Sequence, residues 1–202
     1  WPCFRGAQLD GRVDDAHVEL SRSWGTNPPR VLWAIEVGEG YAGASIRAGR
    51  VYLLDYDRED KGDALRCLSL DDGREIWRYT YPVKVKRNHG MSRTVCAVSD
   101  SVVVSLGPKC HVTCLDSRTG ALKWALDLVR DYGATVPMWY AGQCPLIDGH
   151  NVILAAGGPS LLLAVNAESG DVVWESGNPE DWKMTHSSII PMEAHGQRQY
   201  VY

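Results

Sequence analysis

Residues 114–124 read Cys-Leu-Asp-Ser-Arg-Thr-Gly-Ala-Leu-Lys-Trp and are the clearest of three copies of one pattern. The other copies are Cys67-Leu-Ser-Leu-Asp-Asp-Gly-Arg-Glu-Ile-Trp77 and Ala164-Val-Asn-Ala-Glu-Ser-Gly-Asp-Val-Val-Trp174. Each has a small residue, an aliphatic residue, a polar cluster with Gly, and a Trp four places after that Gly. Arg30-Val-Leu-Trp33 carries only the end of the pattern, and the tryptophans lie 44, 47 and 50 residues apart. A period of this length predicts a repeat architecture.

Each copy predicts a β-hairpin, because Gly73, Gly120 and Gly170 supply the positive φ that a tight turn needs. Two more short strands are expected before each hairpin, at Ala42–Arg47 and Arg50–Asp57, Arg93–Val98 and Ser101–Leu106, and Gln143–Ile147 and Asn151–Ala156. No segment shows a helical period. Four antiparallel strands per period are typical of a β-propeller blade.

The sequence therefore predicts an all-β fold, a partial β-propeller of three to four four-stranded antiparallel blades. Its tryptophans, Trp33, Trp77, Trp124 and Trp174, are expected to fill the gaps between outer strands, where blades splay apart. A β-solenoid and a β-sandwich are the alternatives. A solenoid turn is shorter than this period, and a sandwich would not repeat the Gly-x-x-x-Trp ending.

The composition excludes several classes of protein. The chain has 202 residues, of which 45% are hydrophobic and 23% charged, and a net charge of −4. No apolar run reaches the roughly 18 residues of a membrane-spanning helix, so no membrane span is expected. The mildly acidic net charge does not indicate a nucleic-acid-binding protein, which typically carries a basic patch.

The repeated endings resemble the tryptophan-docking motif of PQQ-like propellers, Ala-x-Asp-x-x-Thr-Gly-x-x-x-Trp, within the wider WD40/YVTN-like superfamily. The opening Trp1-Pro-Cys-Phe-Arg-Gly6 is similar to the start of an exported bacterial subgroup, just after its export signals. Tyr132-Gly-Ala-Thr-Val-Pro-Met-Trp139 resembles the linker before that subgroup's next blade. The resemblance implies a periplasmic or otherwise extracytoplasmic location.

Propellers of this superfamily usually have seven or eight blades, so the chain is expected to cover about half a ring. The expected divisions are an N-terminal segment at 1–38, blades at 39–82, 90–128 and 140–178, and an unfinished unit at 186–202. Residues 30–37 are the candidate for a strand that closes the ring. Half a ring leaves open sheet edges. We therefore expect the remainder of the propeller to come from a longer chain or a second subunit.

The six cysteines do not predict a metal site. Cys67, Cys114 and Ala164 share one repeat position, which indicates a small buried side chain. Cys110 and Cys114 are about 13 Å apart on an extended strand, too far for one metal ion or a disulfide. Cys96 and Cys144 lie on inner strands of adjacent units, where a bridge is an open alternative.

The superfamily that the chain resembles also includes PQQ dehydrogenases, which carry two adjacent cysteines and a set of calcium ligands. This sequence has no Cys-Cys pair. No cofactor is therefore expected, and PQQ with calcium stays the alternative.

A ligand site is predicted at the mouth of the central channel. The first strand of each propeller blade lines the channel, so the segments before those strands should converge. These segments contribute Asn88, His89, Arg93, Trp139, Tyr140, His186 and Ser187. Imidazole and guanidinium groups suit an anionic or hydroxylated ligand, and aromatic faces suit a sugar or planar ring. The alternative is that these polar groups only bond turns and neighbouring blades.

The functional hypothesis is a non-catalytic exported propeller that binds a protein partner or a small polar ligand at this mouth. The alternative is an enzyme, either a PQQ-dependent dehydrogenase or a carbohydrate-active protein that uses the same funnel. The sequence contains no Gly-x-Ser-x-Gly, His-Glu-x-x-His or Walker pattern.

Overall fold

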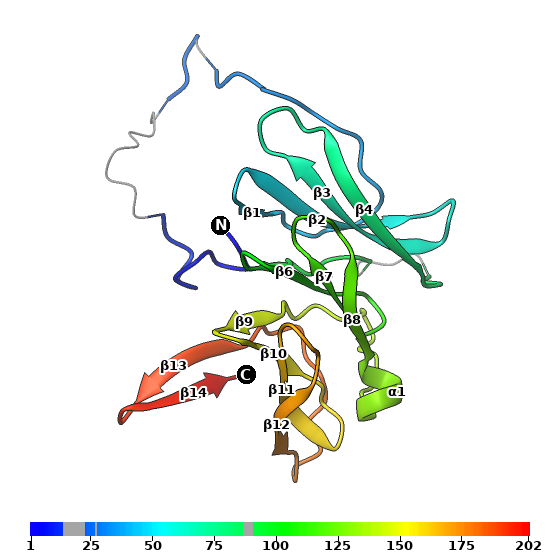
Figure 1. Ribbon diagram of the computed structural model, residues 1–202, viewed down its shortest axis with the longest axis vertical. Helices are drawn as coiled ribbons and strands as arrows, with labels where there is room; N and C mark the ends of the chain where they lie inside the picture. Colours follow the sequence, from blue (N-terminus) through cyan, green and yellow to red (C-terminus); the bar gives the residue numbers. More distant parts are fainter. Residues whose placement is uncertain (14–22, 27, 87–90) are drawn as a thin grey trace.

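The protein is an almost entirely β structure in which consecutive segments form consecutive sheets (Figure 1). It is described from a computed structural model, in residues 1–13, 23–26, 28–86 and 91–202. The first sheet contains β1 (Ser45–Arg47), β2 (Arg50–Asp57), β3 (Gly62–Ser69) and β4 (Glu75–Pro82). The second contains β5 (Ala97–Val98), β6 (Val102–Leu106), β7 (His111–Asp116) and β8 (Leu122–Asp127). The third contains β9 (Leu146–Asp148), β10 (Asn151–Ala155), β11 (Ser160–Asn166) and β12 (Val172–Gly177).

A two-stranded sheet follows, formed by β13 (Ile190–Ala194) and β14 (Gln197–Val201). In each four-stranded sheet the strands pair antiparallel in chain order, so every sheet is a meander. In Figure 1 the three four-stranded sheets lie one after another from top to bottom of the molecule. The all-β, partial-propeller prediction is confirmed.

The first strand of each four-stranded sheet is shorter than expected, and in the second and third sheets side chains take over part of the backbone pairing. Gln143 donates its amide to the Ala155 carbonyl and accepts from the Ala155 N–H at 3.0 Å. Thr94 likewise donates its hydroxyl to the Leu106 carbonyl at 2.6 Å. The backbone pairing of β9 and β5 therefore starts later than the expected Gln143 and Arg93.

One short helix, α1 (Leu128–Tyr132), was not predicted. The Asp127 side chain accepts hydrogen bonds from the backbone N–H groups of Val129 and Arg130. Gly133 ends the helix in the left-handed conformation, with φ of 64°. Such a side chain at the N-cap and such a glycine at the C-terminus are strong helix limits, and five residues are too few to show a period.

Three tryptophans make the same contacts with the following turn. A Cβ on Gly73, Gly120 or Gly170 would lie 2.6–2.7 Å from the ring of Trp33, Trp77 or Trp124 respectively. These glycines also have φ of 72°, 74° and 78°, which L side chains rarely adopt. Each indole N–H donates to the carbonyl three residues before that glycine, at 2.8, 3.4 and 3.0 Å. The polar turns therefore hold the indole of the preceding unit.

Trp174 has a different neighbour. Its ring lies 5.7 Å from the Tyr200 ring of β14, at an interplanar angle of 31°.

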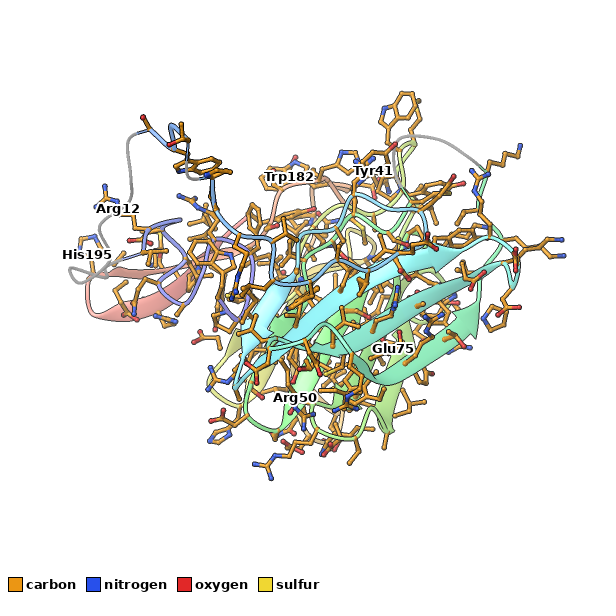
Figure 2. All side chains as sticks on the ribbon, turned by 90° about the horizontal axis from the view of Figure 1, so that it is seen from above. Arg12, Tyr41, Arg50, Glu75, Trp182 and His195 are labelled. Carbon is orange, nitrogen blue, oxygen red and sulfur yellow. The ribbon has the colours of Figure 1, made fainter. Side chains whose placement is uncertain are left out.

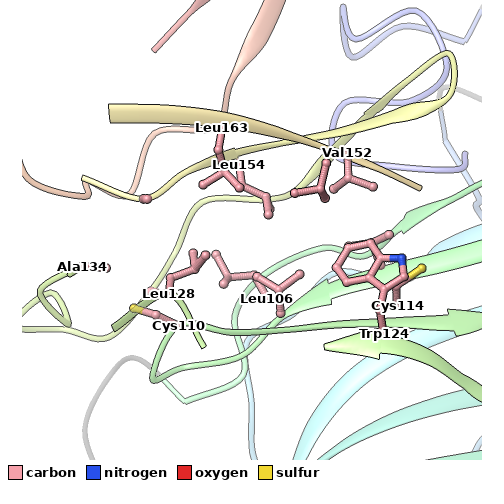
Figure 3. Packing of buried hydrophobic residues seen from close by; sticks show 14 of the residues in the cluster. Leu106, Cys110, Cys114, Trp124, Leu128, Ala134, Val152, Leu154 and Leu163 are labelled. Atoms are coloured by element: carbon pink, nitrogen blue, oxygen red, sulfur yellow. The ribbon is translucent and has the colours of Figure 1, made fainter. Parts of the chain in front are cut away.

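The main core lies between the second and third sheets (Figure 3). Leu106 and Leu128 face Leu154 and Leu163 there, all of them fully buried. A second cluster joins the first two sheets through Leu54, Leu65, Val103 and others. Cys67, Cys114 and Ala164 are 0% exposed, which confirms the small buried position in the repeat. All six cysteines are free thiols.

Residues 28–38, which include the expected ring-closing strand, form no strand. They lie along the first sheet, where Arg66 donates to the Glu36 carbonyl and to Asp55, both at 3.1 Å. The closing of a ring by this segment stays a prediction. Within the described residues, no helix is long and apolar enough for a membrane span.

Candidate functional site

Residues from the starts of four sheets meet in one open depression of about 650 Å³. Arg93 precedes β5, Gly142 precedes β9, and His186 with Ser187 precedes β13. Tyr41, before β1, is on the rim and 66% exposed. Figure 2 shows Tyr41 and Trp182 on one side of the molecule, with Arg50, in the β1–β2 turn region, on the opposite side.

Gly142 allows Arg93 and His186 to flank the depression. A Cβ at this position would lie 2.7 Å from His186 Cδ2 and 3.1 Å from Arg93 Cδ. Any other residue would therefore push the Arg93 and His186 side chains apart. The placement of Arg93 and His186 therefore requires a glycine at position 142.

His186 has a fixed orientation. Its Nε2 donates a hydrogen bond to the Tyr140 carbonyl at 2.9 Å. In the neutral ring this bond makes Nε2 the protonated nitrogen, so Nδ1 is an acceptor for a ligand. The Tyr140 hydroxyl in turn accepts from the Lys86 N–H at 2.7 Å, which holds the Tyr140 side chain on the preceding connection.

Arg93 follows a residue that is anchored in the core. Ser92 is fully buried, has φ of 37°, and donates its hydroxyl to Asp63. The Tyr81 hydroxyl donates to the other Asp63 oxygen at 2.9 Å. Burial raises the pKa of Asp63 from 3.8 to about 7, and the two hydrogen bonds oppose that rise. Asp63 thus fixes the backbone from which Arg93 projects.

The lining of the depression is cationic and apolar. Among the described residues, no Asp or Glu lines it, whereas Phe4, Tyr41, Val95 and Ile190 do. Arg93 gives this lining a positive charge, which favours an anionic group. The arrangement therefore fits a ligand that carries an anion.

The structure brings together only part of the predicted site. Arg93, His186 and Ser187 line the depression, and Tyr140 contributes through its carbonyl. Trp139 is 48% exposed and does not line it. Asn88 and His89 lie outside the described residues.

The contributors that were not predicted include Phe4, Tyr41 and Gly142. The equivalence of the strand starts is a signal that could have identified Gly142. The Val95 N–H bonds Cys144 Sγ, and the Cys144 N–H bonds Ser188 Oγ, so residues 93, 142 and 186 are in matching positions. Nothing local in the sequence indicates that Phe4 reaches this place.

The residues of the depression do not fit a calcium-bound quinone. Calcium prefers several carboxylate and carbonyl oxygens, and no carboxylate of the described residues lines the depression. In the part of the chain that is described, no group of three His, Cys, Asp or Glu side chains could hold a metal ion.

The sequence profile of the family described as outer membrane protein assembly factor BamB matches residues 60–202. No curated protein matches the chain. The structure of BamB from Moraxella catarrhalis is similar over 78% of this chain and 45% of that one, with 17% identity and a TM-score of 0.56.

Two other solved structures are similar in fold. Quinohemoprotein alcohol dehydrogenase ADHIIG from Pseudomonas putida HK5 matches 83% of this chain and 24% of its own, with 19% identity and a TM-score of 0.54. The computationally designed Ika4 protein matches 87% of this chain and 99% of its own, with 12% identity and a TM-score of 0.56. The chain thus spans less than half the length of the two natural proteins. At these identities the likeness is one of fold.

Proposed function

This chain belongs to the family described as outer membrane protein assembly factor BamB, and we propose that it is a non-catalytic propeller module of an exported protein that binds an anionic ligand. The ligand would lie in the depression around Arg93 and His186, as the mouth of the channel. Trp33, Trp77 and Trp124 would serve as docking residues that hold the blades around it. The location outside the cytoplasm rests on the family resemblance.

One observation carries the proposal. Arg93 and His186 approach one another across Gly142, in a depression that no described carboxylate lines. A guanidinium offers a carboxylate two parallel N–H donors, and such charge-assisted pairs are among the stronger hydrogen bonds. The neutral His186 ring has no free donor for a carboxylate, because Nε2 donates to the Tyr140 carbonyl; its Nδ1 would instead accept from a hydroxyl group of the ligand.

The test is a binding measurement with small carboxylates, by ligand-observed NMR on the full chain. Arg93→Gln should weaken acetate binding about tenfold or more, because it removes the positive charge. Arg74→Gln is the matched control, since Arg74 is exposed in the β3–β4 turn, away from the depression. Equal affinities in the two variants would refute the proposal, provided that both keep the melting temperature of the wild type.

A protein partner is the second candidate occupant, and the family description as an assembly factor supports it. An acidic segment of that partner would use the same positive charge. In that case Arg93→Gln should reduce partner capture, while acetate should compete with the partner.

The enzymatic alternative has its own test. Adding PQQ and calcium to the full-length protein should produce no dye reduction with alcohols. Turnover that requires both additions would contradict the non-catalytic proposal.

A further inference from the structure

Residues 1–11, called here the inner segment, lie along the first strands of consecutive sheets. The Ile46 N–H of β1 donates to the Trp1 carbonyl, and the Val98 N–H of β5 donates to the Pro2 carbonyl, both at 2.8 Å. Leu9 packs on the cluster that contains Leu146 of β9. The inner segment therefore takes up backbone donors that β1 and β5 do not use within their own sheets.

The inner segment has a compact shape of its own. Gly6 N–H bonds the Cys3 carbonyl at 3.0 Å, and Gly11 N–H bonds the Arg5 carbonyl at 2.9 Å. The Trp1 ring covers Gly6, where a Cβ would lie 2.9 Å from it. A folded segment on fixed backbone contacts can present a side chain at a defined place.

That side chain is Phe4. Phe4 lines a small cavity together with Leu9 and Leu146. It also lines the depression that contains Arg93 and His186. Phe4 is 42% exposed, so a substantial part of the ring is available for contact.

We propose that Phe4 and Tyr41 form an apolar wall of the ligand site and select a carboxylate carried on a ring, such as an aryl or alicyclic carboxylate. The proposal rests on the anion-binding function above. Arg93 would hold the carboxylate, while the ring of the ligand would cover Phe4. Aromatic pairs add stabilisation beyond the area they bury.

The test compares benzoate and cyclohexanecarboxylate with acetate on the full chain, because acetate carries the anion alone. Both ring acids should bind roughly ten- to thirtyfold more tightly than acetate, from the apolar surface that their rings bury. Phe4→Ala should bring the ratio of benzoate to acetate affinity below about threefold. Phe4→Leu keeps apolar volume and should retain an intermediate ratio.

Leu9→Ala is the matched control in the inner segment, because Leu9 lines the small cavity and not the depression. It should lower the melting temperature and leave the ratio unchanged. A wild-type ratio near one, or a ratio that Phe4→Ala leaves unchanged, would overturn the apolar wall while acetate binding still supports the anion site. Acetate binding that does not depend on Arg93 would instead overturn the proposed function.

Discussion

The contact between Trp124 and Gly170 permits a sharp test of how neighbouring sheets are held together. Gly170→Ala introduces two costs, since the residue has φ of 78° and its new Cβ would lie 2.7 Å from the Trp124 ring. An Ala in the left-handed region costs about 1–2 kcal/mol. Overpacking against the ring adds about 1–3 kcal/mol. The expected total is a loss of roughly 2–5 kcal/mol in the free energy of unfolding.

Gly49 supplies the matched control, because its φ is 71° and a Cβ added there would meet no atom within 4 Å. Gly49→Ala should therefore cost only the backbone contribution of about 1–2 kcal/mol. Trp124 is 8% exposed, so Trp124→Ala alone should cost about 3–5 kcal/mol. In the double variant, which carries Gly170→Ala and Trp124→Ala, the new Cβ no longer meets the ring. The double variant should therefore lose about 1–3 kcal/mol less than the sum of the losses in the two single variants.

Equilibrium urea unfolding of the four variants measures these values. Equal losses for Gly170→Ala and Gly49→Ala, together with additive losses in the double variant, would refute the reasoning. The tryptophan would then lie near the turn without contributing to the contact between sheets.

Three other perturbations test contacts described above. The pKa of Asp63 is raised to about 7 in the folded state, so the folded protein binds the extra proton between pH 4 and 7, and stability should fall as pH rises through this range. Asp63→Asn should flatten this dependence of the free energy of unfolding on pH, whose slope is up to roughly 1.4 kcal/mol per pH unit. Urea titrations at several pH values measure the slope, and an unchanged slope would contradict the role of Asp63. Burial raises the pKa of Cys110 and Cys114 to about 12, so a thiol reagent at pH 7.5 should modify Cys3 first, as mass spectrometry can check. Asp116 accepts three hydrogen bonds from Arg118 and Thr119, so Asp116→Ala should cost about 1 kcal/mol, and Ser69→Ala, which loses one bond of 3.4 Å, should cost less.

Much of the fold is predictable because its determinants are local. The turn glycines and the Trp four residues later recur in sequence, and the structure shows the same indole contacts at Trp33, Trp77 and Trp124. The starts of β5 and β9 were misplaced because Thr94 and Gln143 bond the neighbouring strand through their side chains. The β-propensity of a sequence does not show where a side chain replaces a backbone hydrogen bond.

Only those residues of the candidate site that occupy equivalent positions in the repeat were predictable. Arg93 and His186 precede equivalent strands, so the period places them together. Phe4 is outside any repeat, and the contacts of its segment with β1, β5 and β9 depend on the assembled sheets. The support of Arg93 by Asp63 through Ser92 also joins residues that no motif connects.

The position of the inner segment has a consequence for the order of folding. Its partners extend from β1 to the start of β13, so they are far from it in sequence, whereas each hairpin pairs neighbours. Contacts of long sequence separation form slowly, because the intervening chain must first be ordered. The hairpins should therefore form early, and residues 1–11 should dock late in refolding. A fluorescent label beside Trp1 would then report the last step of a stopped-flow trace rather than the first.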